Sequence, residues 1–160
     1  MTRDEFYEFV MESYRPAEGL IGMVPTDNVD WRPGTGFMSL GQVIYHLSGG
    51  VGTGLDWLLA RKLPAMDEVA ECMKLANLPS CSSKEALEKL ERDKRILRQI
   101  LDGLSEEDFT NKIVSAPWAS AKMERMAFSF LGHFNHHKMQ LFTYLKLLGL
   151  PVDTQTLYGM

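Results

Sequence analysis

The stretch at residues 123–148 constrains the fold more than any other part of the chain, because it has the pattern of one long amphipathic helix. Gly149 and then Pro151 follow it, which is a strong signal for a helix end. Its apolar stripe, at helical spacing, is Met126, Phe130, His133, His137, Leu141, Tyr144 and Leu148. The pattern therefore predicts a helix that faces the core and carries two histidines in the middle of its buried side.

Three other segments have helical spacing and begin with capping signals. Between them we expect a long irregular stretch, a short helix, a short turn, and an extended or irregular segment; these are residues 19–38, 67–75, 105–108 and 111–121. The four predicted long helices are residues 2–15, 39–62, 84–104 and 123–148. Pro16 and Gly19 are expected to end the first of them. No segment shows the alternation of a strand. The prediction is an all-α protein, a four-helix bundle in a single domain spanning residues 1–160.

The second predicted helix carries four glycines, Gly49, Gly50, Gly52 and Gly54. Each costs a helix about 0.8–1.0 kcal/mol relative to alanine. A helix with this many glycines is expected to have close packing or a cavity beside it, and we favour a cavity. His46 lies on the flank of the apolar stripe, less than one turn before Gly50, so Gly50 is expected to line the cavity next to it.

The four histidines of the chain indicate a metal site. His133 and His137 are one helical turn apart, with Cβ atoms roughly 5–6 Å from each other, so both imidazoles can reach one ion. His46, from a separate helix, is the predicted third ligand. Three histidines leave a coordination position open, which is typical of a catalytic site. His136 projects about 60° from His133 and is interpreted as a neighbour of the ligands, an interface residue or an exposed side chain, with Gln140 one turn beyond it.

Composition and charge exclude several classes of protein. The net charge is −4 and there is no run of Lys and Arg, so no nucleic-acid partner is expected. No apolar stretch reaches the roughly 18–20 residues of a membrane span, and the acidic N-terminus is unlike a signal peptide. Cys72 and Cys81 lack the spacing of a disulfide framework or a zinc thiolate site and are expected to be idle thiols. We therefore expect a cytoplasmic protein with no membrane contact.

The string from His133 to Gly149 resembles the last-helix signature of the DinB/YfiT-like superfamily. That signature is a histidine, three residues, a histidine, a basic residue, a variable position, a glutamine and a Tyr-Leu-Arg-Leu-Leu-Gly-like ending. Three other stretches add to the resemblance: Trp31-Arg32-Pro33 followed by Ser39 to His46, then Ala86 to Leu90, and Pro117-Trp118. It implies a four-helix bundle with a divalent ion, usually zinc or nickel, held by His46, His133 and His137, and frequent homodimers.

The resemblance also implies two kinds of enzyme, since some relatives are bacillithiol transferases or a mycothiol-dependent maleylpyruvate isomerase and others are regarded as metal-dependent hydrolases. No catalytic residue can be identified from the sequence. The nearest carboxylates to the predicted site, Asp56 and Glu124, are expected to be surface charges. Without a general base, activation of a low-molecular-weight thiol as the small-molecule substrate is favoured over hydrolysis. Trp118 is a candidate pocket residue.

The sequence is also compatible with two further classes of protein. One is a bundle that binds or senses a metal or small ligand without catalysis, and the other is a purely structural bundle with histidines in its core. Three imidazoles suit zinc, nickel, iron or copper, and the ligand set alone does not choose among them.

Overall fold

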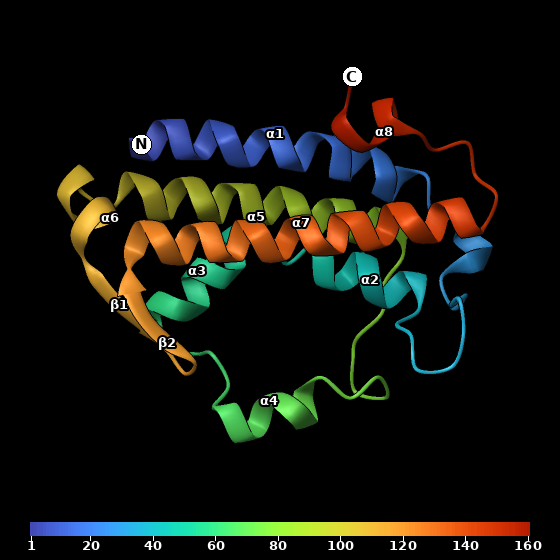
Figure 1. Ribbon diagram of the computed structural model, residues 1–160, viewed down its shortest axis with the longest axis horizontal. Coiled ribbons are helices and arrows are strands. Elements are labelled where there is room, and N and C mark those ends of the chain that lie inside the picture. The colour runs from blue at the N-terminus through green and yellow to red at the C-terminus, as the bar shows by residue number, and fades with distance from the viewer.

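Four helical positions run side by side along the length of the molecule (Figure 1). The computed structural model describes residues 1–160. In chain order the elements are α1 (Arg3–Gly22), the 3-10 helix η1 (Thr26–Asn28), α2 (Leu40–Leu47), α3 (Val51–Leu59), α4 (Met66–Cys72), α5 (Ser83–Asp102), α6 (Glu106–Asn111), β1 (Ile113–Ala116), β2 (Ala119–Lys122), α7 (Met123–Leu147) and α8 (Thr154–Tyr158). Helices α1, α5 and α7 each fill one position, and α2 with α3 fills the fourth. The predicted all-α, four-helix architecture is confirmed.

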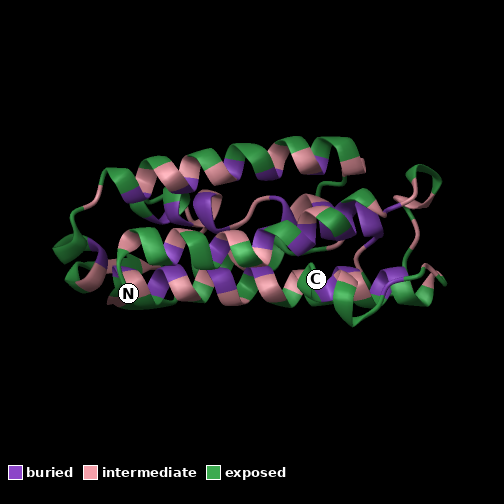
Figure 2. Cartoon of the chain, turned by 90° about the horizontal axis from the view of Figure 1, so that it is seen from above, coloured by how far each residue is buried: buried purple, intermediate pink, exposed green.

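The core forms where the apolar stripes of these helices meet, and buried residues recur along the inward side of each helix (Figure 2). Aromatic rings fill one end of it: Phe6 of α1 lies 5.4 Å from Phe109 and 5.2 Å from Phe128 between ring centroids. Burial of one such side chain stabilises a fold by about 1.5–3 kcal/mol. The fully buried aliphatic residues include Val10, Leu20, Leu40, Ile44, Leu55, Leu90, Leu97, Leu101, Leu141 and Leu145.

Helix α1 is longer than the sequence predicts. It was expected to end near Pro16, whose ring removes one backbone donor, but it continues to Gly22. Pro16 is buried, and the helix continues past it because Ala17, Leu20 and Ile21 extend the same buried stripe. The gain from burying three more apolar residues exceeds the cost of one lost hydrogen bond. The irregular stretch that follows is correspondingly shorter and contains η1.

The prediction of a single helix at residues 39–62 is wrong, because the helix is interrupted after Leu47 and the segment forms two helices, α2 and α3. The backbone at Gly50 has φ −35° and ψ −146°, outside the helical region. Two buried side chains stabilise the new helix start. The Tyr14 hydroxyl accepts a hydrogen bond from the Val51 N–H at 2.6 Å, and Asp93 accepts from the next two N–H groups at 3.0 and 2.6 Å. These contacts occupy backbone donors that the start of a helix leaves free.

A second difference is the hairpin of β1 and β2, where the sequence predicted extended or irregular chain and no strand. The two strands pair antiparallel, with Ile113 opposite Lys122 and Ala116 opposite Ala119, so that Pro117 and Trp118 form the turn. The hairpin connects α6 to α7 and lies against the end of α3 (Figure 1). The short helix α8 was also not predicted. No helix combines the length and the apolar character that crossing a membrane requires.

Candidate metal centre

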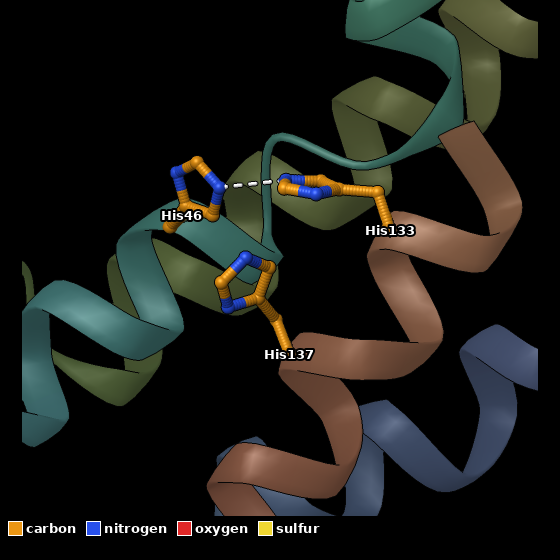
Figure 3. Close-up of side chains that lie close together, drawn as sticks. All are labelled: His46, His133 and His137. Atoms are coloured by element: carbon orange, nitrogen blue, oxygen red, sulfur yellow. Dashed lines mark hydrogen bonds between the residues drawn. The ribbon is translucent and has the colours of Figure 1, made fainter. Parts of the chain in front are cut away.

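Three imidazoles from two helices face a common space at one side of the bundle (Figure 3). His46 comes from the last turn of α2, and His133 and His137 come from the middle of α7. Their ring centroids are 4.4, 4.6 and 5.1 Å apart. One ligand nitrogen from each ring lies within 4.8 Å of the other two, and Nε2 of His46 is 2.8 Å from Nε2 of His133. The structure thus brings together the three histidines that the sequence singles out.

The position of His46 is set by the way α2 begins and ends. Ser39 and Gln42 form a capping box, with the Ser39 N–H donating to Gln42 Oε1 at 2.8 Å. The amide of Gln42 also donates to the carbonyl oxygens of Leu75 and Leu78, at 2.7 and 3.1 Å. These bonds tie the start of α2 to the segment after α4. His46 then lies in the final turn of α2, on the side that faces α7.

A chain of contacts along α7 orients His137. Its Nδ1 is 2.8 Å from Oε1 of Gln140, whose amide nitrogen donates to the Tyr144 hydroxyl at 3.2 Å. The Tyr144 ring packs edge-on against Trp31, with centroids 5.7 Å apart. With Nδ1–H donating to Gln140, the lone pair of His137 is on Nε2. A hydrogen bond of this kind on the other ring nitrogen is the usual support of a metal-binding histidine.

The histidines are held neutral near pH 7. Burial, followed by repulsion from His137 and His133, lowers the pKa of His46 to about 4. Burial and the neighbouring His137 likewise lower the pKa of His133 to about 4, and burial lowers that of His137. His133 is the most exposed of the three residues. Its Nε2 nevertheless faces His46, so the edge of the ring that carries this nitrogen is shielded from water while the opposite edge meets solvent. Neutral rings keep their lone pairs available for a cation.

The donor set fits a divalent transition metal. In a tetrahedral site with metal–nitrogen distances of 2.0–2.1 Å, ligand nitrogens lie about 3.3 Å apart. The observed separations, from 2.8 Å to at most 4.8 Å, span that value. Without a cation, the closest pair of nitrogens must share one proton, since two lone pairs facing each other repel. Three neutral imidazoles with no carboxylate suit zinc, nickel or copper better than magnesium or calcium.

A cavity of about 390 Å³ adjoins the histidines. Its walls are mainly apolar and aromatic; two lining residues carry hydroxyl groups and one carries an ammonium group. The lining residues are Tyr45, His46, Leu47, Gly49, Gly50, Thr53, Gly54, Trp57, Leu63, Pro64, Val69, Met73, Lys89, Trp118, Phe130, His133, Phe134 and His137. A larger hollow of about 510 Å³ lies between α1, α7 and α8, but it contains none of the histidines. The cavity beside the histidines is therefore the one relevant to the site.

The residues predicted around the site take different places. Gly50 and Trp118 line the cavity, and Gln140 contacts His137 directly. His136 is exposed in this single chain and does not line the cavity. Trp31 lies outside the cavity and supports it indirectly through Tyr144.

The glycines predicted to border a cavity also allow close packing. A Cβ at Gly50 would lie 2.2 Å from the Tyr14 hydroxyl, and one at Gly54 would lie 2.5 Å from the ring of Phe130. One at Gly52 would lie 2.3 Å from the backbone oxygen of Asp93. Real Cβ atoms do not approach other atoms this closely. Both explanations of the glycines, a cavity and close helix packing, are therefore found together.

The remaining candidate groups do not reach the site. Asp56 is exposed, and Glu124 lies 3.7 Å from the N-terminal ammonium group; neither lines the cavity. Cys72 is exposed and Cys81 half-buried, and both are free thiols. Burial raises the pKa of Cys81 to about 11, so this thiol stays protonated near pH 7. No carboxylate or thiolate of the chain stands beside the histidines.

Two polar residues near the site were missed by sequence reasoning. Asp93 is buried and caps α3. The sequence pattern does indicate its burial, because Asp93 falls between Leu90 and Leu97 on the inward stripe of α5. Lys89 lines the cavity, but no sequence pattern indicates that it points inward. Its neighbours in sequence are the alternating charges of a solvated helix face, and only the packing of α5 against α2 directs it inward.

Comparison with known proteins agrees with this architecture. The sequence model of the DinB superfamily matches residues 12–141, which include all three histidines. The chain belongs to the DinB superfamily.

Two solved structures have the same fold as this DinB protein. One is a proposed DinB family member from Exiguobacterium sibiricum, with 20% sequence identity, a TM-score of 0.69 and a match covering 96% of each chain. The other is the DinB-like protein YjoA from Bacillus subtilis, with 14% identity, a TM-score of 0.67 and a match covering 92% of this chain and 96% of that one. Among curated proteins, none matches.

Proposed function

We propose that this DinB protein binds one divalent transition metal ion, zinc or nickel, through His46, His133 and His137, and acts as a metal-dependent enzyme on a small molecule held in the adjoining cavity. The observation that supports this most strongly is the convergence of three neutral imidazoles at the wall of an aromatic cavity. Three protein ligands leave a position open towards a substrate, whereas structural sites are usually closed by four.

The chemistry expected at such a centre follows from the donor set. When bound, a divalent ion acts as a Lewis acid that favours the deprotonated form of a water or a thiol. The three histidines are neutral near pH 7, so each has one ring nitrogen with a free lone pair and can serve as a ligand, while Gln140 holds the orientation of His137 through the 2.8 Å contact. Trp57, Phe130 and Trp118 exclude water from the apolar part of the cavity.

The lining residues favour a thiol-dependent transferase over a hydrolase. Hydrolysis benefits from a carboxylate or neutral histidine that takes a proton from the attacking water. No Asp or Glu lines the cavity, and all three histidines beside it are the proposed ligands. A thiol with a pKa near 8.5 needs less help, because the metal alone can hold it as thiolate. We therefore propose transfer of a low-molecular-weight thiol to an electrophile, with hydrolysis as the alternative reaction.

Metal binding is tested by elemental analysis of the purified protein and of His46→Ala, His133→Ala and His137→Ala. The expected result is about one metal ion per chain in the native protein and a large loss in each variant. His136→Ala is the matched control, since it changes an exposed histidine on the same helix and should keep its metal. Full occupancy in the three ligand variants would refute the proposed ligand set.

Catalysis is tested separately, with zinc-loaded protein, a low-molecular-weight thiol such as cysteine, and an alkylating electrophile such as monobromobimane. The proposal expects faster thioether formation than with His46→Ala at the same protein concentration. If the native protein binds metal but gives no acceleration with any thiol or ester tested, the enzymatic part fails. The protein would then be a non-catalytic bundle that binds or senses a metal or a small ligand.

A further inference from the structure

The cavity beside the histidines carries positive charge, because one ammonium group and no carboxylate line it. The cation is Lys89. The histidines add no negative charge, and a divalent ion held by neutral imidazoles would keep a net charge near two. In an apolar cavity such charges act strongly, because little water screens them. The charge pattern therefore favours an anionic occupant.

The contacts of Lys89 hold its ammonium group in place without neutralising it. Nζ donates a hydrogen bond to the Tyr45 carbonyl oxygen at 2.8 Å and lies 3.5 Å from the centroid of the Tyr45 ring. None of the salt bridges of the chain includes Lys89. An ammonium group has three donors, so two remain for another acceptor. Burial lowers the pKa of Lys89, which is the expected effect of desolvating a cation without a carboxylate partner.

The nearest buried carboxylate is already committed elsewhere. Asp93 lies one turn beyond Lys89 on α5 and is fully buried. Its oxygens accept hydrogen bonds from the Tyr14 hydroxyl and from the N–H groups of Gly52 and Thr53. Its negative charge moderates the field at Lys89, but it makes no contact with the ammonium group. The anion that completes the contacts of Lys89 must therefore come from outside the chain.

We propose that the cavity binds a small organic carboxylate, whose anionic group pairs with Nζ of Lys89 and whose apolar part packs against Trp57 and Phe130. A singly charged carboxylate fits better than a phosphate, because the lining residues supply one ammonium group and no arginine. This proposal specifies the substrate class of the proposed function. It depends on the proposed function only for the role of the histidines.

A structural role for Lys89 predicts different behaviour. Its bond to the Tyr45 carbonyl places a cation at the C-terminal end of α2, where helices favour positive charge. If that were its whole role, replacing it would lower the stability of the protein but would not change the preference of the cavity between charged and neutral ligands. The ratio of two affinities, measured on the same protein, separates these possibilities.

The test compares 4-phenylbutyrate with its neutral amide, by calorimetric titration into metal-free and zinc-loaded protein. In the native protein the acid should bind about tenfold more tightly than the amide in both forms, as expected for one charge-assisted hydrogen-bonded pair. Lys89→Met should abolish this preference, and Lys89→Arg should retain it. Lys89→Gln should also abolish this preference while keeping a donor for the Tyr45 carbonyl. The Gln variant therefore replaces the Met variant in the test if the Met variant is unstable. Lys138→Met, at a half-buried lysine outside the cavity, is the matched control.

Three results would overturn the proposal. A preference for the acid that survives in Lys89→Met and Lys89→Gln would show that Lys89 is not the anion-binding group. A preference seen only with zinc bound would place the carboxylate on the metal. Equal or absent binding of acid and amide by the native protein would exclude the carboxylate class. If zinc does not bind at all, the proposed metal function fails, but the titrations of metal-free protein still decide the role of Lys89.

Discussion

Two polar clusters lie inside the same bundle and differ in how their hydrogen-bonding groups are satisfied. In the first, the Tyr14 hydroxyl donates to Asp93 at 2.5 Å and accepts from the Val51 N–H at 2.6 Å, while Asp93 also accepts from two more N–H groups of α3. In the second, ring nitrogens of His46 and His133 face each other at 2.8 Å, and neither ring has a hydrogen-bond partner outside the cluster.

The difference between the clusters distinguishes a structural role from a ligand-binding role. Buried polar groups cost about 1–3 kcal/mol each when left without a partner. The Tyr14–Asp93 cluster finds every partner within the chain and stabilises the break between α2 and α3. In the histidine cluster, His46 and His133 have only each other as partners within the chain, so a bound cation would satisfy lone pairs that the chain leaves free. The clusters are close neighbours, since the Tyr14 ring stacks on Phe134 with centroids 4.4 Å apart and Phe134 lines the cavity.

The largest expected effect comes from breaking the first cluster. Asp93→Ala would leave the Tyr14 hydroxyl and two N–H groups of α3 without their acceptor. We expect a loss of about 3 kcal/mol in the free energy of unfolding, because these bonds involve a buried charge. Urea unfolding monitored by circular dichroism measures it. Asp56→Ala, an exposed carboxylate of α3, is the control and should change stability by less than about 0.5 kcal/mol. An Asp93 variant as stable as the control would contradict the structural role of this cluster.

The second cluster should behave in the opposite way. Zinc at about 100 times its dissociation constant should raise the free energy of unfolding of the native protein by about 2.7 kcal/mol. His46→Ala should lose most of this gain, while its metal-free stability should change by no more than about 1 kcal/mol, since its partners are only the other two rings. Thermal unfolding with and without zinc measures both quantities. Equal stabilisation of native protein and variant by zinc would mean that the ion binds elsewhere.

A third comparison uses two glycines. A Cβ at Gly52 would lie 2.3 Å from the backbone oxygen of Asp93 and 2.8 Å from the backbone nitrogen of Leu97, neither of which can turn away. Gly52→Ala should therefore destabilise the protein by about 2–3 kcal/mol. Gly19→Ala is the control, because nothing lies within 4 Å of its added Cβ. That variant should gain about 0.5–1 kcal/mol from better helix propensity. A neutral Gly52→Ala would mean that α3 and α5 can separate without cost.

The sequence predicts the parts of this molecule that depend on local spacing. The apolar stripes define the four helical positions, and the one-turn separation of His133 and His137 places both rings on the same side of α7. His46 was found in the same way, from its place beside an apolar stripe. These features follow from the geometry of one helix at a time.

Features that depend on contacts between helices could not be predicted from spacing. The break after Leu47 requires Tyr14 and Asp93, which are 79 residues apart in sequence. The inward direction of Lys89 depends on where α5 packs against α2. The hairpin at residues 113–122 has strands of four residues, too short to show alternation, and it is stabilised by docking against α3 and α7. In each case a tertiary contact determines a feature that the local sequence pattern does not specify.

The last comparison concerns the pH dependence of metal-free stability. His46 and His133 have pKa values of about 4 in the folded protein and near 6.5 when unfolded, so between these values the unfolded chain binds more protons. Their neutral forms therefore favour the folded state above about pH 6.5, and this contribution is lost progressively as the pH falls towards 4. Urea unfolding of metal-free protein from pH 7 to 4.5 should show a shallower decline in His46→Ala than in the native protein. Identical slopes in native protein and variant would mean that burial does not lower the pKa of His46.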